Sequence, residues 1–123
     1  MTEQKLFSLM DSFAIKVVAI ASVAKGSVRL LGNKQALPAN SLLSSLFGDR
    51  DAIAALEHSL KDQIMPKIWG QGGVVCVVCR PHPDVIVGLF SDKPRDPVET
   101  YRWSKALDQQ VARLWSHTDD IRQ

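Results

Sequence analysis

The feature that most constrains the fold is a pair of short apolar runs in the second half of the chain. VVCVVCR (74–80) and DVIVGLFS (84–91) are rich in β-branched residues and are separated by PHP (81–83). Short runs of this composition between turn residues are typical of β-strands. Because nearly every residue is apolar, rather than every second one, both faces of each strand must be buried. The two runs therefore predict central strands of a sheet.

The first run contains two cysteines three positions apart, Cys76 and Cys79, followed by His82. A disulfide needs Cα atoms within about 7 Å, whereas strand positions three apart are separated by roughly 10 Å and point to opposite faces. The flanking valines oppose the helical turn in which redox Cys-x-x-Cys motifs sit, and zinc would need a fourth ligand. We therefore expect two structural cysteines and an exposed loop histidine. A thiol or metal protein that uses the Cys76/Cys79 pair remains an alternative hypothesis.

The first third of the chain predicts a helix followed by a β-hairpin. In residues 2–13 apolar side chains recur on one helical face. The next segment is dense in Val and Ile, which favours strands, and residues 26–27 offer a Gly-Ser turn. Residues 15–24 and 27–32 are therefore predicted to pair. In the alternative, the first helix continues through the Ala-rich part of this segment.

The clearest helical pattern lies in DRDAIAALEHSLKDQIMPKIWGQGG (49–73). An aspartate can cap its start, and Pro66 ends or kinks it. The apolar residues that recur at intervals of three and four are Ile53, Leu56, Leu60 and Ile64. Before it, a shorter helical stretch, LLSSLF (42–47), is predicted to be capped by Ser41 and stopped by Gly48.

A second strong helix is predicted in DKPRDPVETYRWSKALDQQVARLWSH (92–117). Asp96, followed by proline and by a glutamate three positions on, forms a helix-start signal. Trp103 and Trp115 lie on roughly one side of this helix. That side is either the core face or a partner surface on which tryptophans act as anchors. The apolar stripe consists of Trp103, Leu107, Val111 and Leu114.

Length and composition indicate one α+β domain over residues 1–123, with a polar tail from about 117. We predict a small antiparallel sheet of four or five strands with helices on its faces, in the order α-β-β-α-β-β-α. The net charge is only +2 and no basic run occurs, so we expect no nucleic-acid partner. The longest apolar-rich stretch, VVAIASVA (17–24), is too short to span a bilayer. The N-terminus lacks the pattern of a signal peptide. We expect a cytoplasmic protein that does not bind membranes.

Motifs that carry catalysis or nucleotide binding are missing from the sequence. It contains no Gly-x-Gly-x-x-Gly or Walker loop and no Gly-x-Ser-x-Gly elbow. WGQGG (69–73) follows a helix and precedes a strand, which is the reverse of a phosphate-binding loop, so we expect a turn there. No catalytic residue, cofactor or metal ligand is predicted, and we expect a protein that is not an enzyme.

The order of elements resembles that of the Roadblock/LC7 family, which consists of small domains with a profilin-like layered fold. The likeness lies in VVAIASVAKGSVRLL (17–31), DAIAALEHSLKDQI (51–64), GVVCVVCRPHPDVIVGLFS (73–91) and DPVETYRWSKALDQQVARLW (96–115). The chain departs from the family pattern in two places. The family usually shows three strands after the central helix, where this sequence predicts two. The segment from 33 to 48 is also longer than a simple connection between a hairpin and a helix.

The resemblance implies a non-enzymatic homodimer with a regulatory or scaffolding role, acting with another protein such as a small GTPase or a signalling complex. In such domains the sheets of two subunits join and the central helices pack together. Carried onto this chain, Ile53, Leu56, Leu60 and Ile64 are divided between core and dimer contact. Trp103 and Trp115, from their place on the last helix, are further interface candidates. A PAS- or GAF-like small-ligand sensor is the alternative, and it needs an apolar cavity of roughly a few hundred Å³.

Overall fold

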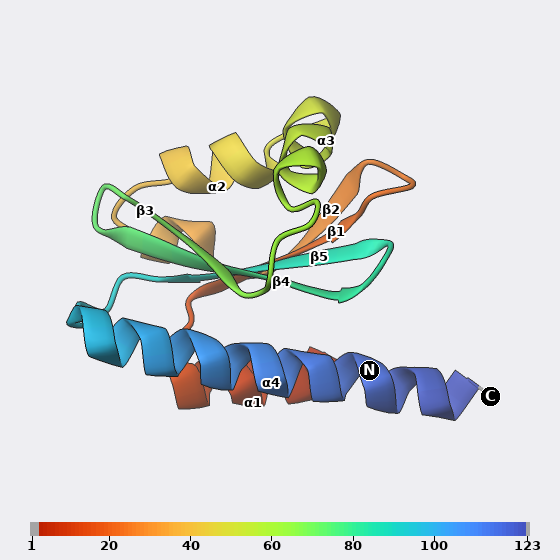
Figure 1. Cartoon of the computed structure of the whole chain (residues 1–123). Helices are drawn as coiled ribbons and strands as arrows, with labels where there is room; N and C mark the ends of the chain where they lie inside the picture. Colours follow the sequence, from red (N-terminus) through yellow and green to blue (C-terminus); the bar gives the residue numbers. More distant parts are fainter. Residues whose placement is uncertain (1–2, 123) are drawn as a thin grey trace.

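The computed structural model describes residues 3–122, with side chains described as far as Ser116. Within these residues, five strands form one antiparallel sheet and helices cover both of its faces (Figure 1). The elements are α1 (Glu3–Phe13), β1 (Val17–Ser22), β2 (Ser27–Gly32), a 3-10 turn (Lys34–Ala36), α2 (Ser41–Phe47), α3 (Arg50–Ser59), β3 (Lys67–Gln71), β4 (Val74–His82), β5 (Val85–Ser91) and α4 (Pro97–Arg122).

The strand order in the sheet is β2-β1-β5-β4-β3. The two apolar runs of the sequence form β4 and β5, which pair with each other, and β5 is the middle strand. Strand β5 is buried along almost its whole length, because α2 and α3 lie on one face of the sheet and α1 and α4 on the other (Figure 1). The prediction of central strands buried on both faces is confirmed.

Each face of the sheet has its own hydrophobic core. The core under α2 and α3, named here the upper core, includes Phe47, Ile53, Leu56, Cys76 and Phe90. The core over α1 and α4, the lower core, includes Leu6, Val77, Cys79, Leu107 and Val111.

Helix α2 lies directly on the sheet. A Cβ added at Gly88 of β5 would come within 2.4 Å of the Phe47 ring, so only glycine allows this approach. The Phe47 ring also meets Phe90 edge to face at 6.0 Å between centroids. The contact leaves no space for a ligand between Phe47 of α2 and strand β5.

The predicted hairpin is confirmed, and the alternative of a longer first helix is wrong. Helix α1 ends at Phe13, and the following Ala14 has a positive φ of 57°. The Ile15 N–H then bonds back to the Met10 carbonyl at 2.9 Å, as in a helix C-terminal motif. The chain thereby leaves the helix and enters β1.

The predicted central helix is shorter than expected. Helix α3 begins after Asp49, whose Oδ1 accepts a hydrogen bond from the Ala52 N–H at 2.7 Å, and it ends at Ser59. Leu60 still points into the upper core, but Asp62 then adopts a positive φ of 60° and turns the chain away. The apolar pattern of the sequence therefore extends beyond the end of the helix. Its last residue, Ile64, is not covered by the sheet.

Two further elements differ from the sequence prediction, so the observed order is α-β-β-α-α-β-β-β-α. A third strand after the helices, β3, occupies KIWGQ (67–71), where the sequence predicted a turn around the glycines. The turn is confined to Gly72 and Gly73, both at positive φ. The predicted short helix exists as α2, but Asn40 rather than Ser41 occupies its N-cap position.

The predicted start of the last helix is confirmed. Asp96 Oδ1 accepts a hydrogen bond from the Glu99 N–H at 2.8 Å, and Pro97 is the first helical residue. Leu107 and Val111 are fully buried in the lower core. The helix continues through the residues from about 117, expected to be a polar tail, to Arg122. Among the described residues, no helix combines the length and the apolar character that crossing a bilayer requires.

Candidate partner interface

Cys76 and Cys79 lie on opposite faces of β4, as the pleat of a strand requires. Cys76 belongs to the upper core and Cys79 to the lower core, and both are free thiols with no exposed surface. The prediction that the two cysteine side chains point to opposite faces of a strand is confirmed, because the two sulfur atoms lie on opposite sides of the sheet.

Burial raises the pKa of both thiols far above its ordinary value. For Cys79 the nearby Asp108 carboxylate raises the pKa further. Both groups therefore stay protonated at neutral pH, which makes them poor nucleophiles and poor metal ligands. Among the described residues, no group of three His, Cys, Asp or Glu side chains is placed to hold a metal ion.

A polar cluster joins the ends of the two hairpins around Asp84. Its Oδ2 accepts a hydrogen bond from the Ser22 hydroxyl at 2.9 Å, and its Oδ1 accepts one from the Ala24 N–H at 2.7 Å. These bonds, the backbone N–H first, lower the pKa of Asp84. His82 ends β4 rather than lying in a loop, and its Nδ1 accepts a bond from the Asp84 N–H at 3.1 Å. Ser22 therefore bonds to a carboxylate and not to a histidine, so the cluster is a structural clamp rather than an activated nucleophile.

The interface candidates from the central helix differ in exposure, and their contact with a second copy stays a prediction. Ile53, Leu56 and Leu60 are buried in the upper core, whereas the Ile64 side chain is 82% exposed. Ile64 lies in the connection between α3 and β3, three residues before the first residue of the edge strand.

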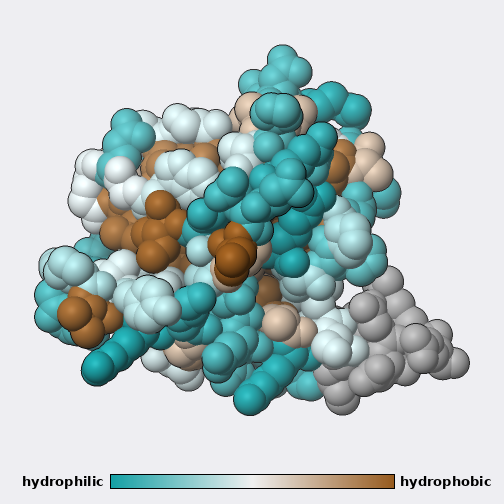
Figure 2. Space-filling view, in the orientation of Figure 1, coloured by the Kyte–Doolittle hydropathy of each residue, from teal (hydrophilic) through white to brown (hydrophobic). Residues whose placement is uncertain are grey.

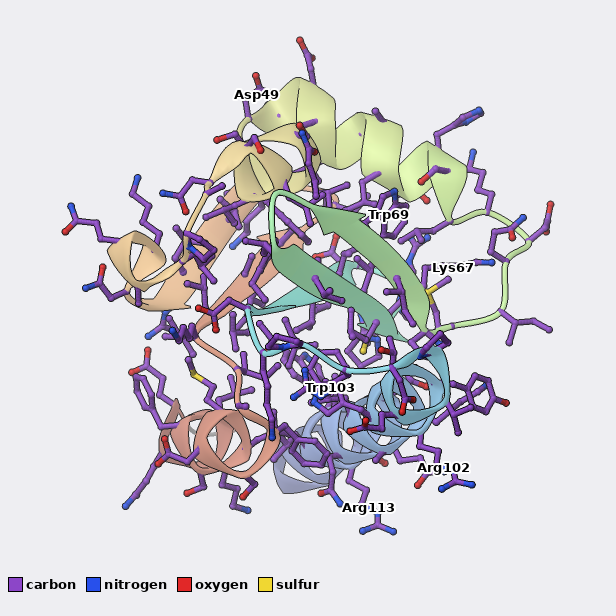
Figure 3. All side chains as sticks on the ribbon, turned by 90° about the vertical axis from the view of Figure 1, so that its left-hand side faces the viewer. Asp49, Lys67, Trp69, Arg102, Trp103 and Arg113 are labelled. Atoms are coloured by element: carbon purple, nitrogen blue, oxygen red, sulfur yellow. The ribbon has the colours of Figure 1, made fainter. Side chains whose placement is uncertain are left out.

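The two tryptophan candidates on α4 have structural roles within the protomer. The Trp103 Nε1–H donates to the Phe13 carbonyl at 2.9 Å, and the Arg95 guanidinium lies 3.8 Å from the centroid of its ring. Trp115 is buried in the lower core. Figure 3 shows Trp103 below the sheet, at the start of α4.

Strand β3 forms one edge of the sheet, and among the described residues it pairs only with β4. Ile68 is 42% exposed and lies opposite Val77, on the lower face, while Trp69 lies opposite Cys76 and packs against the upper core. Figure 3 looks onto this edge, with α3 above it and α4 below. Figure 2 shows apolar surface gathered over the same side of the molecule. Ile64, Ile68 and Trp69 are together named the β3 edge.

The sequence missed Ile68 and the strand that carries it. The signal was present but weak: an isoleucine and a tryptophan stand between Pro66 and the glycine pair at 72–73. An edge strand that helices cover only in part does not need a continuous apolar run. KIWGQ lacks such a run and contains a glycine, so the sequence pattern favoured a turn.

An open hollow of about 360 Å³ adjoins this edge, below the β3–β4 hairpin. Gly70 and Gln71 of β3 line it on one side, and Thr100 and Trp103 of α4 line it on the other. Arg95 also lines it, but this side chain already donates to Ser91 Oγ and to the Lys93 and Phe13 carbonyls. The hollow therefore extends the surface of the β3 edge without adding a free guanidinium.

The architecture matches a solved structure over nearly its whole length. Myxococcus xanthus MglB superimposes with a TM-score of 0.54 at 15% sequence identity, covering 89% of this chain and 90% of that chain. The fold is that of MglB, a Roadblock/LC7 protein. No protein-family model and no curated protein sequence matches the chain. The predicted resemblance to Roadblock/LC7 domains is thus confirmed at the level of the fold, and the missing third strand was β3.

Proposed function

We propose that this protein is a non-enzymatic interaction module that forms a homodimer through the β3 edge. The observation that carries the proposal is the coincidence of an unpaired strand with exposed isoleucines, Ile64 at 82% and Ile68 at 42% exposure. An unpaired edge leaves backbone N–H and C=O groups available for a second chain. Apolar side chains beside them add a hydrophobic gain when they are covered.

The side chains of β3 favour one register for such a dimer. In antiparallel pairing about a two-fold axis at Trp69, Ile68 lies opposite Gly70 of the second copy, and Lys67 lies opposite Gln71 of the second copy. Glycine leaves room for the isoleucine, and no two lysines face each other across the strands. The sheets of the two copies then join into one.

The partner class comes from the Roadblock/LC7 resemblance, which implies action with a small GTPase or a signalling complex. The MglB-like fold supports a protein partner. The buried, protonated thiols support a role without catalysis. We expect the dimer to be the unit that presents a composite surface to that partner.

Sedimentation equilibrium of matched single variants tests the dimer. We expect the wild-type protein to have the mass of a dimer at tens of micromolar, and Ile68→Lys to shift it to a monomer, because a buried lysine at a closed edge is costly. Leu30→Lys is the matched control, since Leu30 is a similarly exposed residue on the opposite edge strand, β2. This control should stay dimeric.

A strictly monomeric wild-type protein at these concentrations would overturn the dimer. If Ile68→Lys and Leu30→Lys dissociate to the same extent, the dimer interface does not lie specifically at β3. For the partner class, affinity capture from the native host with wild type and Ile68→Lys as baits is expected to recover a small GTPase with the wild type only.

A further inference from the structure

The second unpaired edge of the sheet, strand β2, lies on the opposite side of the molecule from the β3 edge. Among the described residues, β2 pairs only with β1. In an antiparallel ladder, alternate residues direct their N–H and C=O groups away from the neighbouring strand. Strand β2 therefore offers a second row of unpaired backbone groups.

An apolar groove runs between this edge and helix α2. Val28 and Leu30 form one wall, Leu43 and Phe47 form the other, and the groove encloses about 200 Å³. Leu30 is 40% exposed there, although Phe47 beneath it is buried. Pockets for drug-sized molecules usually enclose about 300–1,000 Å³. The groove is smaller than that range, so it suits one or two side chains of a peptide better than a free small molecule.

Asn40 lines the same groove and has a side chain that the fold does not use. It occupies the N-cap position of α2 but makes no capping hydrogen bond. Its Oδ1 is buried and accepts no hydrogen bond from the described residues. A buried acceptor without a partner is destabilising, and a donor brought into the groove would relieve this cost.

Three cations lie near this edge. Lys34 lines the groove, Lys25 lies in the β1–β2 turn, and the Arg50 guanidinium donates to the Lys25 carbonyl at 2.9 Å. Lys34 and Arg50 form no ion pair with a described carboxylate, whereas Lys25 lies close enough to the Asp84 carboxylate to help lower its pKa. The Asp49 carboxylate, which caps α3, keeps its negative charge near Arg50, so the cation that acts at the groove itself is Lys34. The edge is therefore complementary to a negatively charged segment.

We propose that the β2 edge and its groove bind an extended acidic segment of a partner protein, which pairs with β2 as an added strand and inserts an apolar side chain between Leu30 and Phe47. Strand addition supplies backbone hydrogen bonds, and the pocket for alternate side chains supplies specificity. A second copy of this chain is a poorer occupant, because pairing of β2 with β2 would bring the same cations of both copies together. The proposal does not depend on the β3 dimer.

A labelled octapeptide that alternates glutamate with leucine and valine is a direct probe of this site. Fluorescence anisotropy measures its affinity for the wild-type protein, in parallel with the same peptide carrying lysine in place of glutamate. We expect the acidic peptide to bind at least about tenfold more tightly, and its affinity to fall as salt rises. Amide hydrogen exchange should show new protection in β2 and none in β3.

Substitutions at exposed residues separate strand addition from unspecific attraction. Leu30→Asp should weaken binding about tenfold or more, because it removes apolar contact and adds a like charge. Lys34→Gln should weaken it about two- to fivefold. Ile68→Asp, the matched variant on the β3 edge, should leave the affinity unchanged.

The proposal would be overturned if the acidic peptide does not bind at about 1 mM, which corresponds to the weakest useful affinities. It would also be overturned if both peptides bind equally well, or if Leu30→Asp and Ile68→Asp lose the same affinity for the acidic peptide. Because peptide binding and oligomeric mass are separate measurements, a monomeric wild-type protein that still binds the peptide would refute the dimer alone.

Discussion

The two edges of the sheet have the same backbone chemistry but differ in the side chains around them. Strand β3 exposes apolar side chains, Ile68 in the strand and Ile64 beside it. Strand β2 has Lys25 in the turn before it and Lys34 after it, and Leu30 forms part of the wall of the apolar groove. An unpaired edge strand can form hydrogen bonds with any extended chain. The side chains beside the strand therefore determine which chain binds. One small sheet can therefore join a second copy at one edge and a different partner at the other.

The edges also differ in how firmly the rest of the fold holds them. The floor of the β2 groove is Phe47, a core residue that packs on Gly88 and Phe90. The turn beside β2 is fastened by the Asp84 carboxylate. Strand β3 is held by β4 and by the contact of Trp69 with the upper core. Substitutions should therefore change protomer stability on the β2 side and association on the β3 side.

The largest effect is expected for Phe47→Ala, which should destabilise the protomer by about 3–5 kcal/mol through lost burial and a cavity over the sheet. Urea unfolding measures this change. Leu30→Ala, on the exposed wall of the same groove, is the control and should stay within about 1 kcal/mol of wild type. Equal losses in the two variants would mean that the groove floor is not part of the core.

An intermediate effect is expected when protein concentration is varied. If the β3 edge forms a dimer, each tenfold rise in concentration should stabilise the folded state by about 1.4 kcal/mol per mole of dimer, by mass action. Thermal unfolding of wild type at several concentrations measures this shift. The midpoint of Ile68→Lys should not move, and a moving midpoint in this variant would place the contact elsewhere.

The smallest effect is expected at Asp84, a half-buried residue whose pKa is lowered below its ordinary value of 3.8. A lowered pKa in the folded state means that the charged carboxylate stabilises the fold above pH 3.8. This contribution is lost as the pH falls through the pKa of the folded state. The stability difference between wild type and Asp84→Asn should therefore be present at pH 6 and shrink towards pH 3, as urea midpoints would show. A difference for Asp84→Asn that stays constant over this pH range would contradict the prediction.

Sequence patterns predicted the elements that have a clear local signal in the chain. The apolar runs of β4 and β5, the hairpin of β1 and β2, and the capped start of α4 were all predicted and are all present. The same reasoning assigned Cys76 and Cys79 to opposite faces, since the pleat of a strand fixes that relation locally. The strand β3 and the early end of α3 were missed.

The early end of α3 has a physical cause that the sequence does not show. The helical period of the sequence continues from Ile53 to Ile64, but the sheet beneath covers only the first part of it. A pattern specifies which residues can share a face and not where the covering surface stops. The uncovered residue, Ile64, and the neighbouring strand edge are therefore where the candidate interface lies.

By itself, the sequence determined the strand periodicities, the helix start at Asp96 and the separation of the two thiols, because each depends on backbone geometry over a few residues. Only the tertiary structure decided which strands became edges, which apolar side chains stayed uncovered and which cations lacked partners. Those properties depend on contacts between segments far apart in the chain, such as Phe47 on Gly88 and Lys34 beside the α2 groove.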